Sequence, residues 1–587
     1  MLLQFVSLLM AVSTVAGIAA VMPFFAVLAD PQLVHTNSWL ERTYRFFNFS
    51  SEQRFLVCLG IGVVVVIIAS NLLNLLGGLA TTRFAFWIGN DFQITLFSEY
   101  LNRDYLFHAR TNSATLVNNT TAQIDRITRG ILMQAVAFTN NVVISFSIVV
   151  AIVFVDPVIA LSTAAGLGGA YGLIYFLVRR KLAEYGRRQS ETGAARMKAL
   201  SEGFGGIKEI IVLHSREVFR SEFQRNCWES SRVQANAQIL SISPKYLLEG
   251  VAVGGLVTVA LLLSFDSDGM SGWLAKISFL GLAAYRLLPS LQWCFQQAAT
   301  MRANRSAFEE LASDLERGRA RLRSAGQRAI ELKERVVQPL QSIEVEDVSF
   351  RYADDRPLVL NNVRMSIPAG ATVGFVGPSG SGKTTLADVL LGLLVPQRGR
   401  LKVDGREVDD TTREVWQLNL AYVPQNIFLT DGTIAENVAF GVHPDQIDLD
   451  RLREAGRLAR IEEFVDSLEH GYQERIGERG VKLSGGQRQR IGIARALYRD
   501  ASVLVFDEAT SALDGITERE VMDAIEALQG QRTIVLIAHR LSTVRKCDMI
   551  FEFESGRVIR SGTFDELVAQ SERFRKMAGL ADPASAS

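Results

Sequence analysis

Long apolar runs without charged residues dominate the first half of the chain. Residues 1–29, 55–82, 130–155 and 157–178 contain no Asp, Glu, Lys or Arg. A membrane-spanning helix needs about 20 mostly apolar residues, because the hydrocarbon core is about 30 Å thick and every backbone polar group must bond within the helix. These four segments therefore predict membrane spans. The first lacks the basic start of a secretory signal, so we interpret it as a span too.

Two further apolar runs contain one charge each. The run at 246–265 holds Glu249 near its start, and the run at 277–300 holds Arg286. Both are long enough to cross a bilayer. Between the first two spans, Ser38 to Glu41 resembles a capping box and predicts a short amphipathic helix outside the membrane. The pattern predicts a bundle of six spans.

The Lys and Arg content of the loops predicts their side of the membrane, since loops rich in these residues stay in the cytoplasm. Residues 179–245 carry thirteen Lys or Arg and residues 83–129 carry five, whereas residues 30–54 carry three. The loops after spans two and four are therefore expected inside, and an even number of spans leaves the C-terminal half there as well.

The second half of the chain has the pattern of a water-soluble domain. From about residue 302 the sequence becomes rich in Arg, Glu and Ala, and alternating apolar residues from Ile343 onward predict strands. We expect a membrane domain at 1–315, a connector at 316–340, a soluble domain at 341–578 and a flexible tail at 579–587.

Composition removes one class of partner. The 62 basic and 62 acidic residues cancel, which gives no electrostatic footprint for nucleic acid. The four cysteines are far apart, without the spacing of a zinc site or a disulfide framework. We therefore expect free thiols and no nucleic-acid partner.

A glycine-rich loop follows the strand pattern of residues 372–376 and precedes an apolar helix pattern. In this setting the loop is typical of a P-loop, whose backbone N–H groups and helix N-terminus hold phosphates. Lys383 would reach the outer phosphates and Thr384 would bind Mg²⁺. The loop consists of Gly377, Pro378, Ser379, Gly380, Ser381, Gly382, Lys383, Thr384 and Thr385.

A second strand pattern, residues 502–506, ends on two carboxylates. Strand ends of this kind are where doubly wound sheets place their ligands. Asp507 is expected to hold the Mg²⁺ shell, and Glu508 to act on the attacking water as general base or orienting group.

At this point the motifs resemble those of the ABC transporter family. Residues 483–487, Leu-Ser-Gly-Gly-Gln, are similar to the family's signature motif. The resemblance extends over residues 343–575 in order and spacing. It implies a type I ABC exporter fold, in which the six-span helical bundle is followed by an α/β P-loop ATPase domain. The matching positions are Tyr352 (adenine stacking), Gln425 (Q-loop), Ser484, Gly485, Gly486 and Gln487 (signature), Asp514 (D-loop) and His539 (switch histidine).

The resemblance implies an ATP hydrolase with ATP and Mg²⁺ as ligands. Gln425, Glu508 and His539 would take part in catalysis, and Thr384, Gln425 and Asp507 in metal binding. Each ATP would lie between the P-loop of one chain and the signature of a second chain. The motifs are intact, which favours a homodimer, although one sequence leaves a heterodimer open. Residues 104–125 and 200–216 would couple the two domains.

The membrane half resembles bacterial lipid-linked oligosaccharide flippases. The segments concerned include residues 105–108, 206–209 and 286–290, and residues 475–480 resemble a loop of ABC exporters that importer ATPases generally lack. The resemblance implies ATP-driven flipping of a polyprenyl-diphosphate-linked oligosaccharide across the inner membrane. Export of other lipids, polysaccharide or peptides stays open, as does import on the same fold, whereas the spans argue against a soluble ABC ATPase.

Arg286 is the candidate substrate residue, because ionisable groups inside a membrane usually line cavities or form pairs. It would contact the pyrophosphate of the substrate. An ion pair with Glu249 is an equally good interpretation.

Overall fold

The structure is a computed structural model, and it divides into two compact units. The first comprises Met1–Arg103 and Arg110–Arg323, and the second Asp104–Ala109 and Ser324–Ser587. The structure describes residues 33–47, 49, 51–153, 157–264, 270–333, 341–509, 515–538 and 540–578, with scattered positions before residue 33. The domain limits expected at residues 315 and 341 stay predictions.

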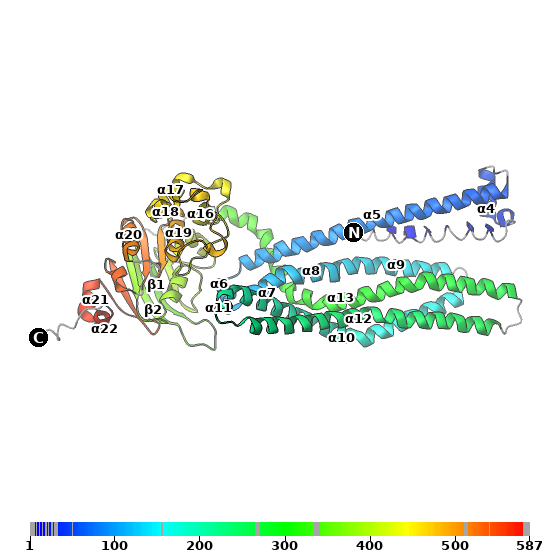
Figure 1. The fold of residues 1–587 in the computed structure, drawn as a ribbon, viewed down its shortest axis with the longest axis horizontal. Helices are drawn as coiled ribbons and strands as arrows, with labels where there is room; N and C mark the ends of the chain where they lie inside the picture. The colour runs from blue at the N-terminus through cyan, green and yellow to red at the C-terminus, as the bar shows by residue number, and fades with distance from the viewer. Residues whose placement is uncertain are drawn as a thin grey trace. The chain divides into compact units, whose positions relative to one another are not determined.

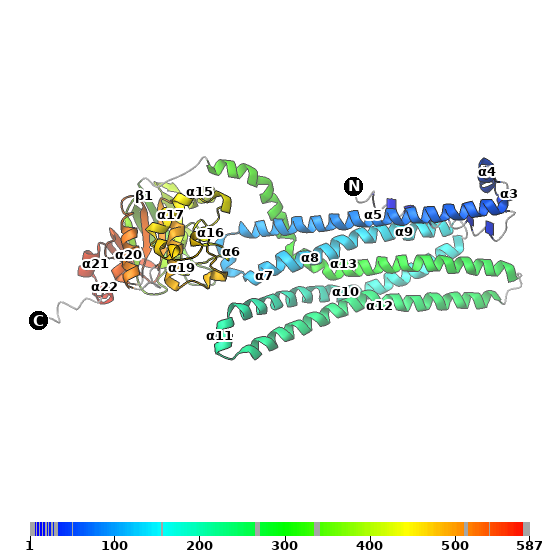
Figure 2. The ribbon, with the colours of Figure 1, turned by 45° about the horizontal axis from the view of Figure 1, so that its top comes forward.

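Long helices build the first unit. Figures 1 and 2 show α10 and α12 as neighbouring antiparallel helices that meet at the short helix α11. The long helices are α5 (Glu52–Leu101), α9 (Met133–Val153), α10 (Pro157–Gly205), α12 (Arg216–Ser264) and α13 (Met270–Lys333). The shorter ones are α3 (Leu33–Thr36), α4 (Ser38–Phe46), α6 (Tyr105–Arg110), α7 (Ser113–Asn118), α8 (Ile124–Ile127) and α11 (Ile207–Val212), with π-helical turns η1 (Asn119–Gln123) and η2 (Thr128–Leu132).

These long helices contain the predicted spans two to six. Within the described residues, Glu52–Leu101 and Ser113–Val150 are long and apolar enough to cross a membrane. The other three predicted spans fall in α10, α12 and α13, and the first lies mostly outside the described residues. The predicted external helix is present as α4, but its N-cap is Asn37, whose side chain accepts a hydrogen bond from the N–H of Trp39, and not Ser38.

The surface of α5 suits a lipid environment. Val57, Ile61, Val64, Ile68 and Leu72 are each more than half exposed in the single chain. Exposed apolar side chains of this density are costly in water and cost nothing against lipid tails. Because the backbone groups of α5 bond within the helix, the segment needs no polar partner there.

The same helix ends in a buried ionic cluster. Glu99 is 1% exposed, and its carboxylate lies 3.0 Å from Nε of Arg103. Two arginines of α13, Arg317 and Arg321, approach the same carboxylate at 3.5 and 3.4 Å, and Arg103 also pairs with Asp314 at 2.8 Å. A buried carboxylate is tolerated only with such partners. The cluster therefore fixes the end of α5 against α13.

The second unit is built on two sheets. Its strands are β1 (Ser342–Phe350), β2 (Leu360–Pro368), β3 (Thr372–Val376), β4 (Arg398–Val403), β5 (Arg406–Glu407), β6 (Leu420–Val423), β7 (Val503–Asp507), β8 (Thr533–Ile537), β9 (Met549–Glu554) and β10 (Arg557–Gly562). An antiparallel sheet has the order β2-β1-β4-β5, and a second sheet the order β10-β9-β3-β8-β7-β6. In the second sheet β9, β3, β8, β7 and β6 pair in parallel.

The central parallel strands are buried along their whole length. Every residue of β3, β7 and β8 is buried, as expected for strands covered on both faces. The C-terminal ends of β3 and β7 lie at the same edge of the sheet, where such folds bind ligands. The helices of this unit are α14 (Lys383–Leu390), α15 (Arg413–Gln417), α16 (Ile434–Val438), α17 (Leu449–Leu458), α18 (Glu462–Asp466), α19 (Gly485–Tyr498), α20 (Gly515–Glu526), α21 (Phe564–Gln570) and α22 (Glu572–Met577).

One short segment leaves the helical part of the chain and packs with the second unit. Asp104–Ala109, which includes most of α6, groups with the residues of the sheets. Leu106 packs against their hydrophobic core. The helix α11, from the other loop expected to couple the domains, groups with the first unit.

The buried cluster predicts a measurable loss of stability for Glu99→Gln. This variant keeps the volume of the side chain but removes the carboxylate that three partly exposed arginines share, so the free energy of unfolding should fall by about 1–3 kcal/mol. Thermal unfolding in detergent would measure it. Asp91→Asn is the matched control, since the Asp91–Arg319 pair at 3.7 Å is half exposed and should contribute below about 1 kcal/mol. Equal losses in both variants would contradict a structural role of the cluster.

Candidate functional site

The loop between β3 and α14 has the backbone of a phosphate cradle. Gly377, Gly380 and Gly382 adopt φ values of 147°, 75° and 102°, which favour glycine. A Cβ atom on Gly377 would lie 2.3 Å from the carbonyl oxygen of Phe553. No side chain fits there, so the loop can approach both the neighbouring strand and a ligand closely.

Lys383 begins α14 and folds back over this loop. Its ammonium donates hydrogen bonds to the carbonyl oxygens of Gly377 and Pro378 at 2.8 and 2.9 Å. Burial lowers the pKa of Lys383, while Glu508 and Asp507 oppose that shift. The ammonium is thus held in the cradle and faces carboxylates across it. Thr384 is exposed beside it, which leaves its hydroxyl accessible.

Tyr352 is tied to the same helix. Its hydroxyl lies 3.2 Å from Oγ1 of Thr385, so the two hydroxyls share a hydrogen bond. Its ring meets Phe350 edge to face at a centroid distance of 5.1 Å. These contacts place an aromatic ring beside the P-loop, where a flat base could stack on it.

Asp507 ends β7 and is 5% exposed. The hydroxyl of Tyr422, on β6, lies 3.5 Å from its Oδ2 at the limit of a hydrogen bond. Asp388 of α14 is also buried, and burial together with the nearby Asp507 raises the pKa of Asp388 to about 6. A cation such as Mg²⁺ at Asp507 would offset this concentration of negative charge.

Glu508 follows in a left-handed backbone conformation with φ of 51°. A non-glycine residue in this region is strained, and such strain concentrates at functional sites. Its carboxylate accepts a hydrogen bond of 2.6 Å from the amide of Gln425. Its carbonyl oxygen accepts one of 3.3 Å from Gln489. The turn therefore directs the carboxylate toward the Q-loop.

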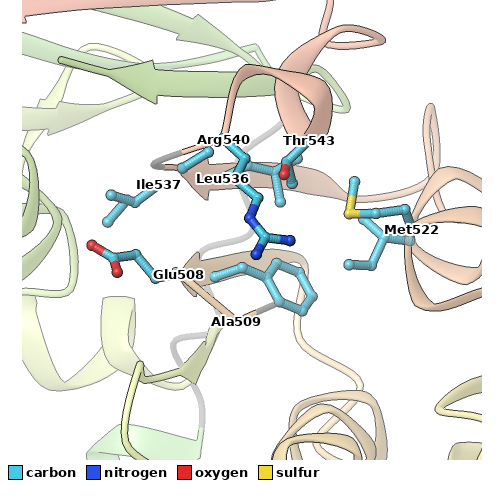
Figure 3. A pocket seen from close by; sticks show the side chains of 10 residues that line it. Glu508, Ala509, Met522, Leu536, Ile537, Arg540 and Thr543 are labelled. Atoms are coloured by element: carbon cyan, nitrogen blue, oxygen red, sulfur yellow. The ribbon is translucent and has the colours of Figure 1, made fainter. Parts of the chain in front are cut away.

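A small pocket lies beside Glu508, with a volume of about 100 Å³. In Figure 3, Glu508 and Met522 lie on opposite sides of this pocket, and the guanidinium of Arg540 points into it. Arg540 pairs with Glu518 at 2.9 Å. The predicted switch residue His539 precedes Arg540, but it lies outside the described residues, as does Asp514.

The signature residues form the start of α19. Ser484 is the N-cap and forms a capping box with Gln487, in which each side chain bonds the other's backbone N–H at 3.2 and 2.8 Å. Ser484 is exposed and Gly485 and Gly486 are half-buried, so this helix end is open at the surface. Within the described part of residues 341–578, no hydrogen bond joins Ser484–Gln487 to the P-loop.

The structure thus brings together the P-loop, Tyr352, Gln425, Asp507 and Glu508, and leaves the signature apart from them. Arg286 lies in α13, and its side chain is outside the described part of the chain. Sequence reasoning missed Tyr422 and Asp388. One signal in the sequence could have indicated Tyr422. It lies three residues before Gln425, near the end of a strand, and parallel strands end at the same edge of a sheet.

Comparison with known proteins agrees with this geometry. The model of the ABC transporter family matches residues 360–511, and that of the ABC transporter transmembrane region matches residues 10–241. The chain is 30% identical to the heterocyst differentiation ATP-binding protein HepA of Nostoc sp. over 86% of its length and 81% of that protein. It is 28% identical to the ATP-dependent lipid A-core flippase of Methylococcus capsulatus, over 96% and 90% of the two chains.

The fold also matches a solved structure, that of a bacterial Atm1-family ABC exporter with ATP bound. The TM-score is 0.77 at 20% identity, covering 97% of this chain and 98% of the other. The chain belongs to the ABC transporter family. It is an ABC exporter in which a helical membrane domain is fused to an ATPase domain, and it couples ATP hydrolysis to transport. The predicted family, fold class and enzyme class are confirmed.

The orientation of Glu508 predicts that Glu508→Gln abolishes most ATP hydrolysis. Loss of a general base lowers turnover by about 100- to 10,000-fold, while binding of a fluorescent ATP analogue should persist. ATPase assays on purified protein would measure both. Glu526→Gln is the control, since Glu526 pairs with Lys546 at 2.6 Å away from the P-loop. Turnover of Glu508→Gln within tenfold of the wild type would contradict the assignment.

Proposed function

We propose that this chain flips an amphipathic lipid across the inner membrane, most specifically a polyprenyl-diphosphate-linked oligosaccharide or a similar glycolipid. Its similarity to lipid A-core flippases over nearly the whole chain is the main support for a lipid substrate. The function of these relatives as lipid A-core flippases equally favours a glycolipid of the lipid A type as a second candidate. In both cases an apolar tail stays in lipid, while the polar headgroup must cross a costly barrier.

We further propose the roles of the site residues. The P-loop, residues 377–385, and Lys383 would bind the phosphates of ATP, and the ring of Tyr352 would stack on adenine. Thr384, Asp507 and Gln425 offer a hydroxyl, a carboxylate and an amide oxygen, which are the ligands that Mg²⁺ prefers. Bound there, Mg²⁺ would neutralise phosphate charge. His539 and Asp514 keep the roles that the family resemblance implies.

Glu508 is proposed to orient and deprotonate the attacking water. Its hydrogen bond with Gln425 holds the carboxylate at the sheet edge that also carries Asp507. A carboxylate placed in hydrogen-bonding reach of water at this edge can accept its proton. The left-handed backbone conformation of Glu508 restricts the directions that its carboxylate can take.

A second copy of this chain is the proposed partner. We propose the open N-terminus of α19 at Ser484 and Gly486 as an anion site, because no hydrogen bond joins it to the P-loop among the described residues. The tip between α10 and α12 also exposes large apolar side chains, with Phe204 74%, Leu213 71% and Val212 68% exposed. Such a patch is typical of an interface. We propose that it docks on the ATPase domain of the partner.

Coupling within one chain would use α6. Its residue Leu106 packs in the core of the ATPase domain, and burial raises the pKa of Tyr105, with smaller contributions from Asp388 and Tyr352. Tyr105 is therefore close to residues that surround the P-loop. A movement of the residues around the P-loop would therefore shift α6, and with it the segments of the membrane domain that precede and follow α6 in the sequence.

The flippase proposal predicts that lipid stimulates ATP hydrolysis. In vesicles, a polyprenyl-diphosphate oligosaccharide should raise turnover several-fold, because substrate binding favours the state that hydrolyses ATP. ATPase measurements with and without this lipid, with Glu508→Gln as the inactive control, would test it. Stimulation by lipid A alone would select the second candidate, and indifference to both lipids would reject both candidates and leave the export of other amphipathic substrates.

The dimer proposal predicts complementation between two inactive chains. Lys383→Ala damages the P-loop and Ser484→Arg damages the signature, so homodimers of either variant contain no intact site. A mixed dimer retains one intact site, formed by the P-loop of the Ser484→Arg chain and the signature of the Lys383→Ala chain. Coexpression should therefore restore ATPase activity. A mixture as inactive as its components would reject composite sites.

A further inference from the structure

Three consecutive cations follow the predicted fourth span on α10. Arg179, Arg180 and Lys181 come directly after Val178, where that span ends, and all three side chains are exposed. They lie within about 5 Å of the end of the span, and the headgroup layer of a bilayer is about 5–8 Å thick. By the predicted orientation this is the cytoplasmic face of the membrane. The three cations therefore fall at the level of the lipid phosphates.

The surface of α10 changes from apolar to basic at this level. Leu173, Phe176 and Leu177 are 63%, 61% and 70% exposed. Arg180 is seven positions after Leu173, so it continues the same face of the helix. The guanidinium of Arg179 lies 4.6 Å from the ring centroid of Phe176. It is therefore directed back toward the span rather than away from the membrane.

The neighbouring helix α12 repeats this arrangement. Its predicted span begins at Tyr246, and the preceding Lys245 is exposed. The ammonium of Lys245 lies 5.7 Å from the ring centroid of Tyr246, and Tyr246 and Leu247 are 68% and 66% exposed. Leu182 of α10 and Leu248 of α12 belong to one buried cluster, and Figures 1 and 2 show the two helices as neighbours. The cations of both helices therefore border one stretch of the membrane surface.

These four cations form no ion pair within the described part of the chain. The nearest acids in the sequence are Glu184, which pairs with Arg188 at 2.9 Å, and Glu249, which is exposed. Cations of α10 further from the membrane have acidic partners within the helix. These pairs are Arg188–Glu184, Arg187–Glu191 and Lys198–Glu202. Apart from the paired Glu184, four positive charges thus accompany one negative charge at the membrane boundary.

We propose that the ends of α10 and α12 bind the headgroups of anionic phospholipids in the cytoplasmic leaflet through these four cations. Each exposed Lys or Arg near an anionic membrane surface adds to the attraction, and a phosphate supplies the missing negative charge. The exposed apolar side chains beside the cations suit acyl chains, so the partner is a lipid and not a free anion. Contacts of this kind would hold both helix ends at the membrane surface. The surface is separate from the substrate contact proposed at Arg286.

Native mass spectrometry of the full-length protein in detergent measures the Kd of individual bound lipids. The probes are phosphatidylglycerol and phosphatidylcholine, which differ in the net charge of the headgroup. The variant with Arg179→Gln, Arg180→Gln and Lys181→Gln together should raise the Kd of the first bound phosphatidylglycerol about tenfold, since three attractive charges are lost. Its Kd for phosphatidylcholine should be unchanged. The charge-preserving variant with Arg179→Lys, Arg180→Lys and Lys181→Arg should still bind phosphatidylglycerol tightly.

The matched control removes three cations from the same helix further from the membrane. The variant with Arg187→Gln, Arg188→Gln and Lys198→Gln should keep the wild-type affinity for phosphatidylglycerol. Three results would overturn the inference: unchanged affinity of the boundary variant, an equal loss in the control, or equal binding of the two lipids to the wild type. Loss of the dimer in the boundary variant, visible in the same spectra, would also overturn it and identify an interface between copies. The comparison does not depend on the flippase proposal.

Discussion

The structure depends on helices that continue without a break from a lipid environment into water. A span uses about 20 residues, yet α5 has 50, α10 and α12 have 49 each, and α13 has 64. In lipid these helices need only their own backbone hydrogen bonds, so α5 can present bare apolar side chains. Beyond the membrane the same helices need contacts with each other. The Glu99 cluster provides one where α5 ends, by placing a carboxylate among arginines from two helices. The cluster therefore joins α5 to α13 beyond the apolar part of both helices.

The ATPase domain has a different requirement from the long helices. It must hold reactive groups in fixed positions and still leave the site open to ATP. Buried parallel strands deliver Gly377, Asp507 and Glu508 to one edge of the sheet. The left-handed turn at Glu508 and the bonds from Gln425 and Gln489 then fix the direction of the last carboxylate. The signature helix starts at the surface with its own capping box, so its side of the site is preorganised but separate. The division explains why a chain with every motif intact still requires a partner in the proposed mechanism.

The sequence predicted the parts of this protein that local patterns determine. A P-loop needs a strand, glycines and a helix in immediate succession, and all three are adjacent at residues 372–390. Uncharged runs of more than 20 residues predicted the long helices, because a run of this kind is also a local pattern. Contacts between distant residues were not accessible: Glu99 meets arginines more than 200 positions away, and Asp388 lies near Asp507 through the fold alone. The N-cap of α4 was also predicted wrongly. Asn37 and Ser38 are both good N-cap residues, and only the backbone conformation of the residues before the helix selects Asn37.

The charge inside α13 places a further demand on the membrane domain. Arg286 falls within the predicted span, where a charge is expensive unless it lines a cavity or forms a pair. The same helix continues to Lys333, well beyond the end of that span at Thr300, and its Arg317 and Arg321 meet the carboxylate of Glu99. A headgroup bound at Arg286 would therefore act on a helix that is also anchored to α5.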